Sequence, residues 1–364
     1  MNFINLLEEI SDPREEWKVR HNLSTLIFTT LCGVLCGAES WSDISDFCEA
    51  KEEWLSQYVD LTNGIPSPWT FRRIFTLLNP ELLEWLLRTH AANLVDKDIS
   101  KHIVIDGKSL RGSKRHNLKC LHSISAMCHE QGLVLAEMGV DQKSNEITAI
   151  PLLLDLLDLK GNTITIDAMG CQQTIAHKIA EKQGDYVLAL KKNHPKFYEQ
   201  IESYCQQNII NAEHRLKDYF DDSHGRRVRR RYFACDISHM DEVKNWNGLR
   251  SVIATETISS LDNDSKVTAE WRYYLTSHQS NNSALPNYIR HHWSIENKLH
   301  WVLDVQLGEE ADQKAERRSA KAFAVLKRIA LNIVRTKDTD SKRSLRRKFK
   351  CAAWDNNYLL NLLT

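Results

Sequence analysis

The pattern of apolar and polar positions divides the chain into a helical first part and a second part where strands and helices alternate. Up to about residue 98, apolar residues recur at the spacing of amphipathic helices, beginning with a long helix predicted over Glu15–Gly37. Ser40 and Asp43 are placed as in a capping box, and Ser67-Pro68 is a typical helix start. We therefore predict an all-helical N-terminal domain over 1–98.

From Lys101 the apolar period changes to that of strands. Short β-branched runs and the segments between them predict strands at 103–107, 123–128, 133–140, 163–168 and 186–190, with helices at 146–157 and 172–182. Three strands in a meander followed by helix–strand–helix–strand are the element order of a ribonuclease-H-like α/β core. The second part therefore predicts an α/β domain of that kind.

The later segments complete this predicted organisation. Residues 208–285 alternate in the strand manner and predict a mainly β insertion. Pro286–Val305 predicts one continuous helix that resumes the core. The core is thus split into 99–207 and 286–340 by the insertion, and a basic, helical tail over 341–364 ends the chain.

Three carboxylates are the strongest candidates for chemistry. Asp106 and Asp167 each end a strand that reads as buried, where open α/β sheets bind their ligands. Glu296 lies well inside the predicted 286–305 helix. If the three converge, their hard oxygens suit Mg²⁺ or Mn²⁺, and two such ions serve phosphodiester chemistry. The structural alternative for Glu296 is an ion pair with Arg290 or Lys298.

Composition restricts the class of partner and the compartment. Of 364 residues, 48 are Lys or Arg and 48 are Asp or Glu, so a nucleic-acid partner requires clustered basic residues. The nine Cys are scattered and no signal peptide is evident, which favours a reducing cytoplasm. Leu23–Ala38 is apolar but shorter than the ~20 residues of a membrane span, so no membrane partner is expected.

The basic residues do cluster. Arg226–Arg231 holds five arginines interrupted only by Val228, and it is the strongest phosphate-binding candidate, with a solvated surface as its alternative. Trp293 either stacks on an unpaired base or belongs to the core. The full set of candidate DNA contacts is Lys108, Arg111, Lys143, Asn145, Lys191, Lys192, Arg226, Arg227, Arg229, Arg230, Arg290, His292, Trp293 and Lys298.

Structural alternatives apply to several of these residues. Lys108 is an exposed loop residue in its alternative role, and Asn145 is a helix N-cap. Asp304 is either an auxiliary acid or an ion-pair partner of Lys298 or His300. The acids that follow, Glu309, Glu310 and Asp312, are expected to be surface charge.

Long motifs then link the chain to a known family. The chain contains IDGKSLRGS, QKSNEITAIPLLLDLLDLKGNTITIDAMGCQ, HGRRVRRR and RHHWSIENKLHWVLDV, and over nearly its whole length it resembles DDE transposases of the ISAs, or H-repeat-associated, insertion-sequence family. It departs from the family pattern at Pro68-Trp69 and at Gln306–Glu310.

The resemblance implies a function. It implies a transposase in which Asp106, Asp167 and Glu296 form the metal-binding DDE triad with Mg²⁺ or Mn²⁺. The expected substrate is double-stranded DNA, at both the element ends and the target, and the expected active form is a homodimer. Three alternatives remain: a nuclease without strand transfer, a non-catalytic DNA-binding copy, and a hydrolase of small phosphoesters.

Overall fold

The structure is a computed structural model. It describes residues 3–10, 12, 14–96, 99–110, 113, 120–140, 146–208, 215–223, 226–261, 267–311, 314 and 316–364. The chain divides into two compact units. Unit 1 contains Met1–Lys97, Gly107–Lys143 and Glu296–Thr364, and unit 2 contains Asp98–Asp106 and Ser144–Ile295.

Unit 1 is mainly helical. Its N-terminal helices are α1 (Phe3–Glu8), η1 (Glu16–Lys18), α2 (Leu23–Leu35), α3 (Trp41–Ala50), α4 (Glu52–Leu55), α5 (Pro68–Leu77) and α6 (Pro80–Leu94). The predicted helix over Glu15–Gly37 is too long, because α2 begins at Leu23 and the predicted first turns contain only the 3₁₀ turn η1. The predicted capping box is confirmed, since Ser40 and Asp43 exchange both side-chain-to-backbone bonds at the start of α3.

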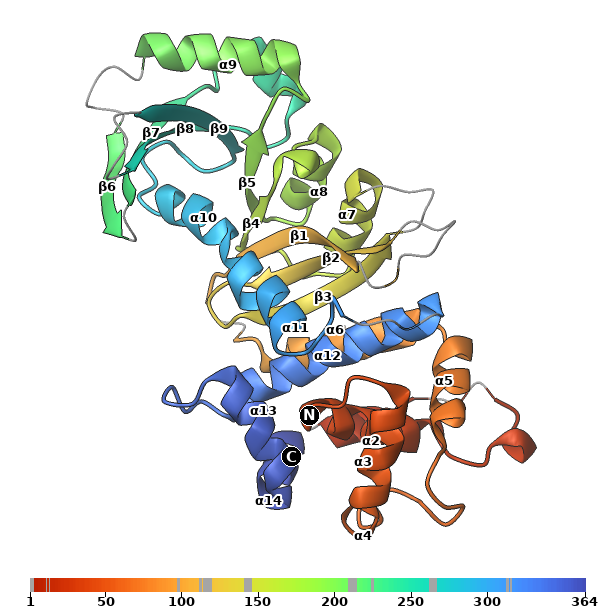
Figure 1. The fold of residues 1–364 in the computed structure, drawn as a ribbon. Coiled ribbons are helices and arrows are strands. Elements are labelled where there is room, and N and C mark those ends of the chain that lie inside the picture. The colour runs from red at the N-terminus through yellow and green to blue at the C-terminus, as the bar shows by residue number, and fades with distance from the viewer. Residues whose placement is uncertain are drawn as a thin grey trace. The chain divides into compact units, whose positions relative to one another are not determined.

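The later elements of unit 1 pack around one long helix. They are β2 (Leu121–Cys128), β3 (Leu133–Val140), η6 (Glu296–His300), α11 (Trp301–Val305), α12 (Arg317–Lys337), α13 (Leu345–Trp354) and α14 (Asn356–Leu363). Helix α12 runs beside α6 below β3 (Figure 1). Asn332 of α12 bonds both the N–H and the carbonyl of Val134, at 2.8 Å each, and so satisfies the backbone of β3 at that residue.

Unit 2 is an α/β body. Its elements are α7 (Glu146–Asp155), β4 (Thr163–Ile166), η3 (Ala168–Gly170), α8 (Gln173–Glu181), β5 (Asp185–Leu190), α9 (Pro195–Asn208), β6 (Arg215–Ser223), β7 (Arg226–Asp236), η5 (Asp241–Asn245), β8 (Ser251–Leu261), β9 (Thr268–Thr276) and α10 (Leu285–His292). Strand β1 (His102–Leu110) contributes its first five residues to this unit.

The strands of unit 2 are hydrogen-bonded in the order β1-β4-β5-β9-β8-β7-β6. The pairs β1–β4 and β4–β5 are parallel, whereas β5–β9 and the strands beyond it are antiparallel. Strand β4 and the first four residues of β1 are buried, as the β-branched runs of these two strands predict. In the described part of 208–285 the strands are β6 to β9.

A small core fixes α10 against the sheet of unit 2. Leu285 and Ile289 of α10 pack with Val187, Tyr232 and Ile253 from three strands. Among the described residues, no helix has the length and apolar character needed to cross a bilayer. The helices and the large sheet together make the fold mixed α/β. Helix α10 leads directly to the segment that carries Glu296.

Candidate active site

Two of the three candidate acids lie side by side in unit 2, where the pairing of β1 with β4 ends, although β1 itself continues past Asp106 to Leu110. Strands β1 and β4 are parallel, and Ile105 is the register partner of Ile166. The next residues are Asp106 and Asp167, so both carboxylates follow the last paired residues of neighbouring strands, whose backbones are ~4.8 Å apart. Both residues are half-buried. This arrangement offers hard oxygen ligands at a strand-end edge, and such ligands fit Mg²⁺ or Mn²⁺.

The turn after β4 holds Asp167 in place. Its Oδ1 accepts a hydrogen bond from the N–H of Met169 at 3.1 Å and so caps the η3 turn. Gly170 closes this turn so tightly that an added Cβ would lie 2.2 Å from Cγ2 of Ile166. Burial, followed by the charge of Glu146, raises the pKa of Asp167 above its usual value. A nearby cation would relieve both effects, and the sequence alone did not reveal Glu146 as a neighbour.

A pocket of about 420 Å³ lies beside Asp167 in unit 2. Its aromatic lining includes Tyr198, Trp271 and Trp293, and its basic lining includes Lys191 and Lys192. Both lysines are exposed, and neither ammonium group forms a hydrogen bond or ion pair with the described residues, although the charge of Lys191 lowers the pKa of Asp167. The pocket thus combines a carboxylate, free ammonium groups and flat rings. Such a combination suits a strand of nucleic acid.

His292 and Trp293 end α10 with opposite exposures. The His292 side chain is buried, with Nδ1 3.0 Å from Oγ1 of Thr165. Burial lowers the pKa of His292 to about 4, so this ring is neutral at physiological pH and is poorly placed as a phosphate contact. Trp293 is 58% exposed, which contradicts its core alternative.

The arginines of β7 are not equivalent. Alternate side chains of a strand point to opposite faces, so Arg227, Arg229 and Arg231 share one face. Arg229 donates to both carboxylate oxygens of Asp218, at 3.0 and 2.6 Å. Arg231 is paired with Glu256, and Arg227 lies 3.6 Å from Asp222. The side chain of Arg226 lies outside the described residues. Neighbouring acids therefore pair with the arginines on this face of β7, although the arginine run is the most prominent basic cluster in the sequence.

The opposite face of the same hairpin carries basic groups for which the described part of the chain offers no acidic partner. Arg230 and Tyr232 point to this face, on which α10 packs. Arg290 of α10 donates to Tyr219 Oη at 3.1 Å, and its guanidinium lies 4.2 Å from the centre of that ring. Lys217 donates to Oδ1 of Asn287 at 3.3 Å. A hollow of about 300 Å³ is lined by Lys217, Tyr219, Tyr232, Asn287 and Arg290, among others. We call Lys217, Arg230 and Arg290 the α10-side basic set.

Glu296 lies in unit 1 on a π-helical turn. The predicted single helix over Pro286–Val305 is wrong, because α10 stops at His292 and residues Glu296–His300 form a π turn before α11. The Glu296 side chain is 65% exposed, and Oε2 lies 3.1 Å from Nδ1 of His300. π turns in helices are frequent at functional sites. Sequence spacing alone could not reveal the extra residue in the turn.

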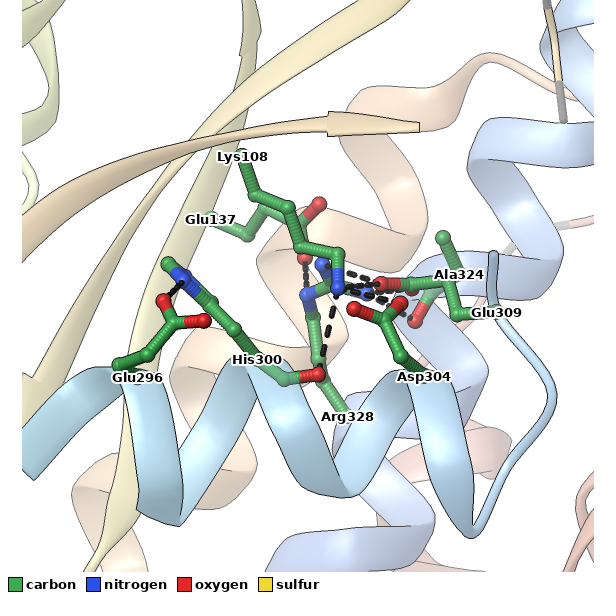
Figure 2. Close-up of polar contacts among 8 residues, drawn as sticks. All are labelled: Lys108, Glu137, Glu296, His300, Asp304, Glu309, Ala324 and Arg328. Atoms are coloured by element: carbon green, nitrogen blue, oxygen red, sulfur yellow. Dashed lines mark hydrogen bonds and ion pairs between the residues drawn. The ribbon is translucent and has the colours of Figure 1, made fainter. Parts of the chain in front are cut away.

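A buried network of charges lies next to this turn (Figure 2). Lys108 is only 9% exposed, and Nζ is 2.5 Å from Oδ1 of Asp304. Arg328 and Glu309 are fully buried, and they are paired at 2.5 Å. The exposed-loop alternative for Lys108 is therefore wrong, and so is the expectation that Glu309 is surface charge. Asp304 pairs with Lys108 rather than with Lys298 or His300. The only signal for Arg328 in the sequence was a charge inside an apolar-periodic helix.

The remaining candidate residues are placed as follows. Lys298 is half-buried and donates to the carbonyl of His129 at 2.7 Å within unit 1. Burial lowers its pKa, and Arg335 adds to this effect. The predictions for Arg111, Lys143 and Asn145 lie outside the described residues.

Comparison with known proteins identifies related sequences. Residues 98–333 match the family described as Transposase DDE domain, and residues 4–91 match the family described as DDE_Tnp_1-associated. The chain is 39% identical over 378 residues to Putative protein YbfL of Escherichia coli strain K12, covering 100% of this chain and 98% of that protein. It is 38% identical over 378 residues to the H repeat-associated putative transposase YhhI of the same strain, with the same coverage.

A shorter relative and a solved structure complete the comparison. The H repeat-associated putative transposase YbfD of the same strain is 40% identical over 248 residues, covering 65% of this chain and 96% of that protein. The cryo-EM structure of a piggyBac transposase synaptic complex with hairpin DNA aligns with a TM-score of 0.43 and 11% identity, covering 99% of this chain and 76% of that one. That score is too low to establish a common fold.

Proposed function

The chain belongs to the DDE transposase family, and from that premise we propose that it cuts DNA at the ends of an insertion sequence and joins them to target DNA. The resemblance that the motifs indicated is confirmed by the family match over 98–333 and by H repeat-associated relatives. The chain is therefore a DNA-cleaving and strand-transferring enzyme. Its reaction at element ends and its dependence on Mg²⁺ or Mn²⁺ are the parts that we propose.

One observation carries the proposal. Asp106 and Asp167 each follow the last register-paired residue, Ile105 and Ile166, of two parallel strands in one unit. Burial and Glu146 raise the pKa of Asp167 while Lys191 opposes the shift, so a cation beside this carboxylate favours its ionised form. We propose that Asp106, Asp167 and Glu296 hold two divalent ions. Such ions activate an attacking oxygen and stabilise charge on the phosphodiester.

The basic groups of unit 2 would position the DNA. Lys191 and Lys192 share the pocket with Asp167 and would contact phosphates next to the scissile bond. Trp293, exposed at the rim of the same pocket, would stack on a base. Along the hairpin, the α10-side basic set is the better candidate for the DNA backbone, because its cations are not already paired with carboxylates.

Other elements of the proposal come from the family and the sequence. The core over 99–207 and 286–340 would have the ribonuclease-H-like arrangement, with 208–285 as its insertion, 1–98 as a helical associated domain and 341–364 as a basic tail. The protein would act in the cytoplasm on double-stranded DNA. Since two element ends must be cut together, the active form would be a homodimer.

A cleavage assay on the DNA that flanks this reading frame tests the proposal. The protein is incubated with labelled element ends and a target plasmid, with Mg²⁺ or with EDTA, and both cut and joined products are counted. Asp167→Asn and Glu296→Gln should reduce cutting and joining to background while DNA binding persists. Asp155→Asn is the matched control, because Asp155 is an acid of unit 2 that pairs with Lys178 at the surface.

The outcomes separate the alternatives. Cutting without joined products would indicate a nuclease rather than a transposase. Substantial Mg²⁺-dependent cutting by Asp167→Asn would refute the assignment of that carboxylate.

A further inference from the structure

Lys108 is a buried cation with three oxygen partners in unit 1. Its Nζ donates to Oδ1 of Asp304 at 2.5 Å and to the carbonyl of His300 at 3.3 Å, and Oε2 of Glu309 lies 3.5 Å away. Figure 2 shows the side chain extending from β1 toward the helical segment that begins at Glu296. A lysine so enclosed is poorly placed to contact a phosphate, because DNA would have to replace these partners.

The partners of Lys108 lie on the segment that carries Glu296. His300 is the last residue of the π turn that Glu296 begins, and Asp304 lies one helical turn further along. His300 also approaches the carboxylate of Glu296, with Nδ1 at 3.1 Å from Oε2. The ammonium of Lys108 therefore holds two points of this segment, one through the backbone and one through a side chain.

The network is fixed from the other side by α12. Arg328 donates to Glu309 at 2.5 Å and to the carbonyl of Ala324 at 2.9 Å, and it is ion-paired with Glu137. This network contains two cations and three carboxylates, which are Lys108 and Arg328 with Glu137, Asp304 and Glu309. Without Lys108, Asp304 would lose its cation and Glu309 would lose one of the cations around it, keeping its pair with Arg328. The α11 segment would then be pushed from its place by unpaired charge.

We propose that Lys108 is a positioning residue that holds the Glu296 turn in the geometry required for divalent-metal binding. It acts through His300 and Asp304 and touches neither DNA nor metal. The inference rests on the proposed function of Glu296 as a metal ligand. Residues that orient metal ligands in this indirect way typically change metal affinity or activity by about 10–100-fold when they are replaced.

The test compares Lys108→Met with Lys321→Met in the full-length protein. Lys321 is the matched control, because its Nζ pairs with Glu84 at 2.6 Å in the same unit and forms no bond to the Glu296 segment. Three quantities are measured: Mn²⁺ binding to the DNA-free protein by electron paramagnetic resonance, DNA affinity in EDTA, and the single-turnover cleavage rate against Mg²⁺ concentration. Thermal unfolding of every variant is recorded alongside.

Lys108→Met should weaken Mn²⁺ binding in the same direction as Glu296→Gln. It should also lower the cleavage rate by about 10–100-fold and shift it to higher Mg²⁺ concentration, with DNA affinity in EDTA unchanged. Lys321→Met should leave all three quantities at the wild-type values. If Lys108→Met does not fold, Asp304→Asn removes the same ion pair with a side chain of the same shape and should give the same changes.

Two results would overturn the inference. One is wild-type Mn²⁺ binding by folded Lys108→Met or Asp304→Asn. The other is loss of DNA affinity in EDTA with an unchanged rate, which would make Lys108 a phosphate contact. Failure of the proposed function looks different, because the wild-type protein itself would then show neither Mn²⁺ binding nor metal-dependent cleavage.

Discussion

Arg328 in α12 and Arg229 in β7 both form paired contacts with carboxylates, yet their surroundings differ. Arg328 is fully buried between Glu137 and Glu309 in unit 1. The side chain of Arg229 is 39% exposed beside Asp218 in unit 2. Water can solvate the partners of the second pair but not those of the first, so removing one partner costs far more stability in the buried network than on the exposed strand face. The comparison teaches that the consequence of an ion pair depends on its burial more than on its geometry.

The largest expected effect is on stability. Arg328→Met should lower the free energy of unfolding by about 3–5 kcal/mol, because two buried carboxylates lose their common cation. Arg229→Met should lower it by no more than about 1 kcal/mol. Urea unfolding followed by circular dichroism measures both. Equal losses of unfolding free energy for the two variants would show that burial does not distinguish the two ion pairs.

The next effect concerns DNA and the two faces of β7. Replacing the α10-side basic set with Gln should reduce the slope of log affinity against log salt by about 0.9 per lost phosphate contact. Replacing Arg227, Arg229 and Arg231 with Gln should change the slope much less, since these three guanidiniums are already paired with acids. Fluorescence anisotropy over a salt series measures both triple variants. A larger change for the paired arginines would reverse the assignment of faces.

The smallest effects concern pH, and their signs are opposite in the two regions. Burial raises the pKa of Glu137 to about 7, against the opposing charge of Arg328. Glu137 therefore holds its proton more tightly in the folded protein, and its contribution to stability falls as pH rises from about 4.5 to 7. The hydrogen bond from Arg229 lowers the pKa of Asp218. The contribution of Asp218 is therefore present above its unfolded pKa and is lost as pH falls through the folded value.

The free energy of unfolding, measured at a series of pH values, tests these two opposite pH dependences. The difference between wild type and Glu137→Gln should vary between pH 4.5 and 7, whereas the difference for Asp218→Asn should vary only at lower pH. If the Glu137→Gln difference is flat between pH 4.5 and 7, the pKa of Glu137 is not raised.

Most of the secondary structure was predictable because it depends on local periods. The strands at 123–128 and 133–140 and the strand end before Asp167 follow from β-branched runs bounded by Gly and polar residues, whereas the predicted strand at 103–107 is too short because β1 continues to Leu110. The π turn at Glu296–His300 was not predictable, since one additional residue in a turn leaves the apolar spacing almost unchanged.

The pairing of charged side chains also could not be predicted from the sequence. Whether Arg229 meets Asp218 depends on the register between β6 and β7, which the arginine run does not reveal. Glu309 is acidic and lies in a polar stretch, so local composition placed it at the surface. Its burial depends on Arg328 and Lys108, which come from an apolar helix and from a distant strand. Long-range partners therefore decide which charges are free to meet a ligand.

The tight turn at Gly170 has a consequence for recognising inactive transposase copies from their sequences. A single methyl group at this position would collide with Ile166, the residue immediately before Asp167. A transposase copy with this substitution would therefore keep all three acids of its triad and still lose activity. The presence of the three carboxylates alone does not show that a copy is active.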